Sequence, residues 1–452
     1  MVDREVDVLV VGAGTGGAYT AWKLAGAGYS CLVLEKEPLD ELGKAIGPFH
    51  MEELAFERFG MPLPQGDELL HVISDVNMWA PDLRQCVSFK FPTLVMDKPK
   101  FIRRMHGYAR EAGAEIIERA GVEELQFERG VLRGVKARGA AGELAVSARL
   151  VIDASGIDGA VRTRMPASPW FENDPISAED TIFVYMETWK DVRGELPPGV
   201  NSYPYHQGWC APGPGDTRIV GIGMAGSIEA ARRRHREFVK GLPITGEVVD
   251  STMGRIPYRR PPYSLVDNGL MVAGDSACMN KPFSGEGVTS GFTGCAIAAR
   301  VAAAALAADD LTREALWDLN MKYLRGQGAK FAFLTAVLPG LMGIGPGEMD
   351  LLFSAGLVTG ESSVAMQEKY EVTTDIAGSL KALPVLARGL ATGGLKLSSL
   401  ARIARAGLAA GRLKAHYGCY PAHPLGFGAW VKHAGPLWRG VERARHEYFA
   451  GL

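Results

Sequence analysis

The chain has 452 residues, enough to bury a large core in one elaborated domain or in about two or three smaller ones. A formal net charge of −2 argues against a strongly charged partner such as nucleic acid. The six cysteines are scattered without a CxxC pair, so neither a disulfide framework nor a metal site is expected. The sequence lacks a basic-then-apolar leader, and its apolar stretches fall short of the roughly 20 residues of a membrane span. We therefore expect a cytoplasmic protein.

A glycine-rich turn lies close to the start of the sequence. An apolar strand at 8–11 enters Gly12-x-Gly14-x-x-Gly17, and a helical pattern and a second apolar run follow before Glu35. In such a turn Gly12 makes the bend, Gly14 lets a pyrophosphate approach and Gly17 lets helix and strand pack. Glu35 comes 18 residues after Gly17, where its carboxylate would accept hydrogen bonds from a ribose. Taken alone, this signature fits NAD as well as FAD.

The middle of the chain alternates between short strand patterns and two helical patterns. Alternation with Val, Phe and Trp predicts strands between 72 and 96, and small residues end a buried strand at Asp153-Ala154-Ser155-Gly156. Basic faces mark both helical patterns. Further expected strands are 115–118, 131–137, 148–153, 181–188 and 216–224, and the expected helices are 101–112 and 228–240.

A second signature follows far downstream. A strand expected at 268–273 delivers Gly274-Asp275, where backbone can approach a ribityl chain and a carboxylate can bind its hydroxyls. Gly285 and Gly287 precede an apolar helical pattern, whose N-terminal dipole would stabilise negative charge on a reduced flavin. If one nucleotide is bound by both signatures, the cofactor predicted is FAD.

These motifs resemble the FAD-dependent geranylgeranyl reductases, within the larger group of flavoproteins that includes the aromatic hydroxylases. The resemblance covers nearly the whole chain. It extends beyond the two signatures to 259–263, 316–320, 326–330 and the tail segment 417–430.

The resemblance implies hydrogenation of isolated double bonds in a prenyl chain borne by a lipid or quinone, with hydride from N5 of the reduced flavin. The electron donor would be ferredoxin or NAD(P)H. It implies a Rossmann-like FAD-binding α/β domain with an inserted, mainly antiparallel β-sheet substrate region and a helical C-terminal part. The expected division is FAD-binding segments at 1–70, 98–165 and 263–305, substrate-region segments at 71–97 and 166–262, and the helical region at 306–452.

The resemblance also places cofactor and substrate residues, while it marks no catalytic residue. Tentative substrate residues are Trp209, Pro212 and Cys278. The expected cofactor-binding residues are Gly12, Gly14, Gly16, Gly17, Glu35, Lys36, Lys44, Lys98, Val122, Ala154, Gly156, Gly274, Asp275, Gly285 and Gly287.

Three positions depart from the family pattern. Ile46 replaces the cysteine of a Gly-x-x-Cys-Gly loop, and only Trp209 and Pro212 remain of a Tyr-x-Trp-x-Phe-Pro motif on the substrate side. Lys281 replaces an asparagine in the flavin loop, either as a cation that raises the flavin potential or as a solvated side chain. Cys278 is either a proton donor or a small buried residue.

The C-terminal part is basic and without acidic residues between Asp375 and Glu442. Its helices would either lie on anionic lipid or cap the domain with a solvated basic face. Two other functions stay open: a FAD-dependent monooxygenase of an aromatic substrate, and a prenyl-lipid carrier without chemistry. The positive charges are Lys381, Arg388, Lys396, Arg402, Arg405, Arg412, Lys414, Lys432 and Arg439.

Overall fold

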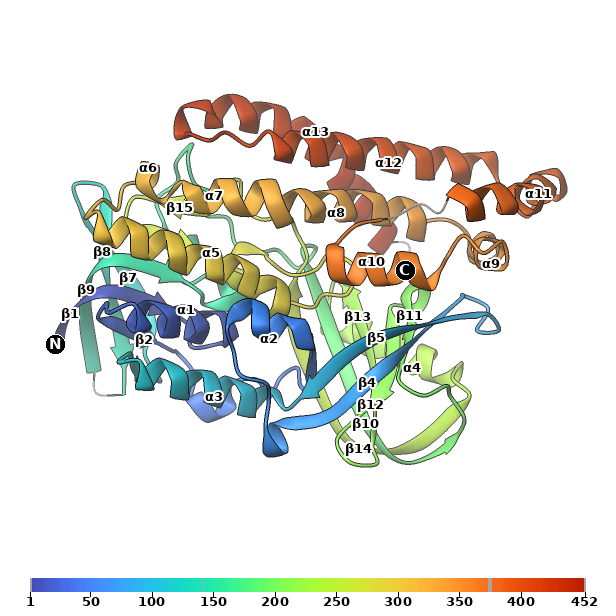
Figure 1. Ribbon diagram of the computed structural model, residues 1–452, viewed down its shortest axis with the longest axis horizontal. Helices are drawn as coiled ribbons and strands as arrows, with labels where there is room; N and C mark the ends of the chain where they lie inside the picture. The colour runs from blue at the N-terminus through green and yellow to red at the C-terminus, as the bar shows by residue number, and fades with distance from the viewer. Residues whose placement is uncertain (1, 141, 373–375, 451–452) are drawn as a thin grey trace.

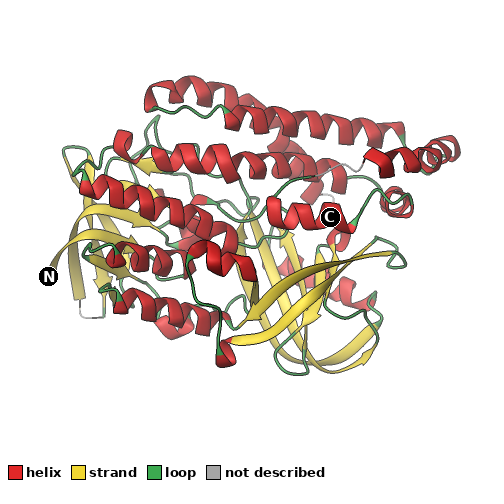
Figure 2. Ribbon diagram, in the orientation of Figure 1, coloured by secondary structure: helices red, strands yellow, loops and turns green. Residues whose placement is uncertain are grey.

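The computed structural model describes residues 2–140, 142–372 and 376–450. Two eight-stranded sheets lie side by side, and a layer of long helices runs across them (Figures 1 and 2). The N-terminus begins in the first sheet, and the C-terminal helices form the edge of the molecule at the top of the view. This arrangement confirms the predicted fold class. The division into six segments is kept as a proposal.

The first sheet is parallel at its centre, and its strands are buried on both faces. β1 (Val2–Val11) pairs in parallel with β2 (Cys31–Leu34) and β9 (Gly142–Asp153), and Val8 to Val10 are fully buried. Near-continuous apolar runs of this kind are typical of parallel strands covered on both sides. The order is β15-β16-β9-β1-β2-β6; β8 pairs antiparallel with β9, and β7 pairs antiparallel with β8. The remaining strands are β6 (Glu115–Ile117), β7 (Gly121–Glu128), β8 (Val131–Gly139), β15 (Val266–Asp267) and β16 (Leu270–Val272).

The second sheet is antiparallel except where β11 runs parallel to β4. Its order is β14-β10-β13-β12-β11-β4-β5-β3. β10 and β14 form a long antiparallel pair, from Thr181 opposite Pro257 to Gly194 opposite Ile244, and the register shifts at two points. The strands are β3 (Phe49–Glu52), β4 (Leu69–Trp79), β5 (Cys86–Met96), β10 (Thr181–Gly194), β11 (Val200–Tyr203), β12 (Gly208–Pro212), β13 (Arg218–Ala225) and β14 (Ile244–Pro257).

The helices of the first layer pack on the parallel sheet. α1 (Thr15–Gly26) contacts both α3 (Lys98–Glu111) and α5 (Val288–Ala307). α3 begins where the Asp97 side chain accepts a hydrogen bond from the Lys100 amide at 2.9 Å, with Pro99 in the first turn. α2 (Glu53–Phe59) and α4 (Ile228–Lys240) flank the second sheet.

The C-terminal helices form the outer layer in Figure 1. α12 (Leu397–Gly418) packs against both α8 (Ala329–Met342) and α13 (Phe427–Ala450). A π-helical turn, Leu324–Gly328, joins α7 (Asp318–Tyr323) to α8. The other helices are α6 (Arg313–Leu316), α9 (Pro346–Ser354), α10 (Gly360–Lys369) and α11 (Ile376–Thr392).

One described helix, α5, is long and apolar enough to cross a membrane by length and composition alone. A bent pair, Arg313–Met342 with Pro346–Ser354, passes the same criterion when counted together. However, 61% of the apolar window of α5 is buried inside the protein. A core helix gives the same signal, so we treat α5 as part of the core.

Candidate functional site

The turn after β1 has no room for side chains at two of its glycines. Gly12 has a φ of 102°, and a Cβ there would lie 2.4 Å from the Ala154 carbonyl oxygen. A Cβ at Gly17 would lie 1.9 Å from the Gly12 carbonyl oxygen. By contrast, Gly14 and Gly156 face open space. The turn is therefore closed on its protein side and open where Gly14 and Gly156 lie.

Glu35 is held at the end of β2 by two backbone amides. Its carboxylate accepts a hydrogen bond from Ala13 at 2.7 Å and another from Glu37 at 2.9 Å. The side chain is buried, with a residue exposure of 6%. These bonds fix its carboxylate beside the glycine-rich turn, as a ribose-binding acid requires.

The second signature ends β16 with a glycine in left-handed conformation, Gly274, whose φ is 69°. Within the described part of the chain, the Asp275 carboxylate receives no hydrogen bond. Burial raises the pKa of Asp275, and the charge of Lys98 opposes that shift. Burial likewise lowers the pKa of Lys98, while Asp275 opposes it. The structure thus brings Lys98 near Asp275, as a dinucleotide site would need.

The two helices that begin at the signatures lack side-chain caps. α1 begins after Gly14 and α5 after Gly287, and neither residue can provide a capping oxygen. A Cβ at Gly287 would lie 3.0 Å from the Asp275 carboxylate. Free helix N-terminal amides bind anions, and the unpartnered Asp275 suits hydroxyl groups. The residues of both signatures therefore fit FAD.

The other expected cofactor residues lie in different surroundings, some at the surface and some buried. Lys36 forms an ion pair with Asp158 at 2.7 Å, and Lys44 pairs with Glu41 at 2.7 Å, both at the surface. Val122 is buried on β7. Gly16 faces inward, where a Cβ would meet the Cys295 sulfur at 3.0 Å.

The three tentative substrate residues do not share one cavity. Cys278 lines a cavity beside the second signature, whereas Pro212 lines another formed by the end of β10, the β12–β13 turn and the start of β14. Trp209 packs on Gly221, where a Cβ would come within 2.3 Å of its ring. Burial raises the pKa of Cys278 to about 11, against the charges of Arg259 and Arg162. A thiol in that state keeps its proton at neutral pH.

Lys281 is buried rather than solvated, with 1% of its side chain exposed. Its ammonium donates to Glu286 at 2.7 Å and to Glu52 at 3.2 Å. Thr289 also donates to Glu52 at 3.1 Å, and His50 forms a short contact with Glu286. This corrects the solvated alternative: the cation is neutralised by two carboxylates that join β3 to the second signature.

The ion pairs among Lys281, Glu286 and His50 determine the direction in which the pKa of each group is shifted. Burial would lower the pKa of Lys281, but Glu286 and Glu52 hold it well above its ordinary value. Burial would raise the pKa of Glu286, but Lys281 and His50 hold it far below. Burial would lower the pKa of His50, yet Glu286 raises it on balance. The sequence analysis did not single out His50, Glu52 or Glu286, although Glu286 lies between the two glycines of the motif.

The comparisons with known proteins agree with this site. A family model described as an NAD(P)-binding Rossmann-like domain matches residues 10–46. A digeranylgeranylglycerophospholipid reductase of Sulfolobus acidocaldarius is 25% identical over 95% of this chain and 96% of its own length. The chain is thus similar over nearly its whole length to this digeranylgeranylglycerophospholipid reductase. The resemblance predicted from the motifs, and with it the prediction of an oxidoreductase, is thereby confirmed.

Solved structures give the same architecture. A geranylgeranyl bacteriochlorophyll reductase-like protein of Thermoplasma acidophilum superposes with a TM-score of 0.68 at 19% identity, covering 86% of this chain and 99% of its own. A flavin-dependent brominase superposes with a TM-score of 0.61 at 16% identity, covering 96% and 99%. At these identities the likeness concerns the fold alone.

Proposed function

We propose that this relative of the geranylgeranyl reductases is a FAD-dependent enzyme that hydrogenates isolated C=C bonds of a prenyl chain on a lipid or quinone. What carries the proposal is the similarity to a digeranylgeranylglycerophospholipid reductase over 95% of the chain, with both signatures intact. Bound FAD would supply hydride from N5 of its reduced form.

The residues divide the binding of FAD between them. We assign the α1 N-terminus to the pyrophosphate and Glu35 to the adenosine ribose. Asp275 is assigned to the ribityl hydroxyls and the α5 N-terminus to the pyrimidine edge. Lys98 and Lys36 supply positive charge nearby.

A cluster of apolar side chains on the second sheet lies next to the second signature. A Cβ at Gly285 would lie 3.2 Å from Ile256 on β14, and one at Gly254 would lie 2.1 Å from Ile46. Ile46 thus packs on β14 where the family pattern has a cysteine. The prenyl chain would lie along the half-buried members of this cluster, which would exclude water from the double bond: Ile46, Ile182, Trp209 and Ile256. Val184, Met186 and Ile219 are buried in the same cluster.

Anaerobic turnover tests the proposal. The FAD-loaded protein is reduced with dithionite, ferredoxin or NADPH and mixed with prenyl lipids and prenyl quinones, and the products are analysed by mass spectrometry. We expect flavin reoxidation together with a gain of two hydrogens per reduced bond. Persistent reduced flavin without any hydrogenated product would contradict the proposal.

A pair of variants tests the FAD site, and two further measurements distinguish the reductase from a monooxygenase and from a lipid carrier. Asp275→Asn should lose bound FAD, whereas Asp250→Asn, at an exposed position of β14, should retain it. Substrate-dependent oxygen uptake with an aromatic compound would instead indicate a monooxygenase. A purified wild-type protein that binds prenyl lipid without flavin would indicate a carrier.

A further inference from the structure

Strand β3 presents two titratable side chains to the loop of the second signature. Its burial alternates, so Phe49 and Met51 pack in the core while His50 and Glu52 share the opposite face. Both side chains on that face contact residues of the loop or of the helix that follows it. Strand and loop therefore meet through ionisable groups.

Five side chains form a linear set of contacts, the His50 network. His50 Nε2 contacts one oxygen of Glu286, whose other oxygen accepts a hydrogen bond from Lys281 at 2.7 Å. Lys281 also donates at 3.2 Å to one oxygen of Glu52, whose other oxygen accepts from Thr289 at 3.1 Å. Each carboxylate oxygen thus has its own partner, and the network runs from the imidazole to the first turn of α5.

The charges of the His50 network balance when His50 is an imidazolium. Glu286 and Glu52 bring two negative charges into a largely buried place, and Lys281 brings one positive charge. An uncompensated charge is costly there, and a protonated His50 supplies the missing positive charge. Tyr370 lies beside the network, with 5.6 Å from its ring centre to the Lys281 ammonium, and stays neutral because burial raises its pKa.

His50 is the end of the network that reaches solvent. Its side chain is 38% exposed, whereas that of Lys281 is 1% exposed. Glu286 occupies Nε2, and among the residues that the structure describes no hydrogen bond reaches Nδ1. A proton given up from Nδ1 can therefore be replaced from water.

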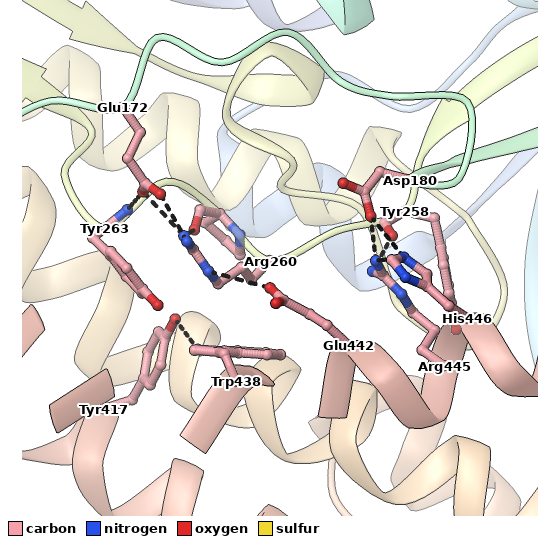
Figure 3. Close-up of polar contacts among 11 residues, drawn as sticks. Glu172, Asp180, Tyr258, Arg260, Tyr263, Tyr417, Trp438, Glu442, Arg445 and His446 are labelled. Atoms are coloured by element: carbon pink, nitrogen blue, oxygen red, sulfur yellow. Dashed lines mark hydrogen bonds and ion pairs between the residues drawn. The ribbon is translucent and has the colours of Figure 1, made fainter. Parts of the chain in front are cut away.

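Helix α13 is fastened over another side of the second signature. Its Arg445 forms an ion pair with Asp180 (Figure 3). Its Glu442 lies 3.9 Å from Arg260, which donates to both oxygens of Glu172 at 2.7 and 3.0 Å. The gap that remains beneath the helix has a volume of about 10 Å³, room for about one water molecule. Bulk water is thus kept from this side of the loop.

Cys278, the other candidate acid, lines that narrow gap. Burial raises the pKa of its thiol to about 11, so it is a weak acid at neutral pH. His50 combines an acidic form with access to water, and it borders the apolar cluster proposed for the prenyl chain. Ile46 precedes it shortly before β3, and a Cβ at Gly285, next to its partner Glu286, would lie 3.2 Å from Ile256.

We propose that His50 is the proton donor of the hydrogenation. The inference rests on the proposed function, because it names the acid that this reaction consumes. The N–H bond at Nδ1 breaks as a C–H bond forms on one alkene carbon, and the other carbon receives a hydride whose two electrons come from reduced FAD. A proton from water then restores the imidazolium, while Nε2 stays on Glu286.

Histidine NMR of the FAD-loaded protein tests the charge state without turnover. The imidazole resonances are followed over pH, and His50 is assigned by its absence from His50→Gln. We expect the pKa of His50 to lie above 6.5 in the wild type and at least about one pH unit lower in Glu286→Gln, since an adjacent opposite charge shifts a pKa by about 1–3. An ordinary or lowered pKa in the wild type would overturn the proposal.

Anaerobic turnover with prenyl lipids tests the donor role. The wild-type rate should fall as the pH rises through the His50 pKa, and Glu286→Gln should move that fall to lower pH. His50→Gln keeps a hydrogen bond to Glu286 without a transferable proton, so its rate should drop at least about 100-fold. His433→Gln, which removes an exposed imidazole on α13, should behave like the wild type.

The outcomes separate this proposal from the proposed function. A rate in His50→Gln within a few-fold of the wild type would overturn the donor and leave the reductase standing. If His50→Gln loses its FAD, the pH profile of Glu286→Gln decides, and a profile like that of the wild type would overturn the donor. A wild-type protein whose His50 titrates as expected but which hydrogenates no prenyl lipid would contradict the proposed function, and the donor role with it.

Discussion

Gly17 lies where α1 crosses the turn after β1, and its lack of a side chain sets how closely helix and strand approach. A Cβ there would meet a backbone oxygen, which cannot rotate away as a side chain can. Gly26, in the last turn of the same helix, faces open space. A methyl group would therefore clash with the backbone at Gly17 and would meet no neighbouring atom at Gly26.

We expect Gly17→Ala to lower the free energy of unfolding by about 1–3 kcal/mol, because the turn must shift, and to lower the amount of bound FAD. Gly26→Ala should instead raise stability by up to about 1 kcal/mol, since alanine favours the helix. Denaturant unfolding and the flavin content of the purified variants measure both effects. Equal behaviour of the two variants would rule out the packing role of Gly17.

Features formed by residues close together in the sequence could be predicted from it, whereas ion pairs between residues far apart in the chain could not. Gly12 and Gly17 pack closely within one turn, as their spacing predicts. The role of Glu35 as the ribose acid stays a prediction. Lys281 is neutralised by Glu286, five residues away, and by Glu52, 229 residues away, and no spacing rule connects Lys281 with Glu52. The sequence was therefore compatible with both a buried and a solvated lysine.

At the scale of elements, exposure explains why the sequence did not predict β14. Strand β14 is exposed along most of Ile244–Pro257, so it has no apolar alternation to reveal it. The strand expected at 268–273 is β16, Leu270–Val272, and it begins later than expected because residues 268–269 form the turn from β15, where Gly269 has a φ of 74°. The helix expected at 101–112 begins earlier, at Lys98, because Asp97 caps it.

The link between β3 and the second signature predicts a pH dependence. The folded-state pKa of His50 is raised by Glu286 above the ordinary value of 6.5. Its contribution to stability is therefore fully present below about pH 6.5 and is lost as the pH rises through the folded-state pKa.

We expect the wild-type Tm to exceed that of His50→Gln most at about pH 6, and the gap to narrow towards about pH 9. His433→Gln removes an exposed imidazole on α13 and should give a gap that does not depend on pH in this way. Thermal unfolding over this range measures both. A constant gap for His50→Gln would show that its protonation does not stabilise the loop.

At the scale of the whole molecule, the C-terminal helices present basic and apolar groups together. All nine basic side chains of this region are exposed. Leu397 and Leu408 of α12 are 74% and 64% exposed, and Leu383 of α11 is 55% exposed. Exposed leucines among basic residues are typical of surfaces that lie on anionic lipid. We propose this face as a peripheral membrane contact, which suits a lipid-borne substrate.

Vesicle flotation tests the contact. The protein should float with phosphatidylcholine vesicles that contain phosphatidylglycerol and less with phosphatidylcholine alone. The double variant Leu397→Asp, Leu408→Asp should lose much of that binding. Val249→Asp, at an exposed site on β14, should not. Absence of the wild-type protein from both lipid fractions would contradict the proposed membrane contact.

The pair of Asp180 and Arg445 also has a consequence for synthesis. The two residues are 265 positions apart, so the arginine is synthesised well after the aspartate. At about 5–20 residues per second, Asp180 spends roughly 13–53 s on the nascent chain before its partner exists. The helix α13 therefore cannot cover this side of the fold until that interval has passed.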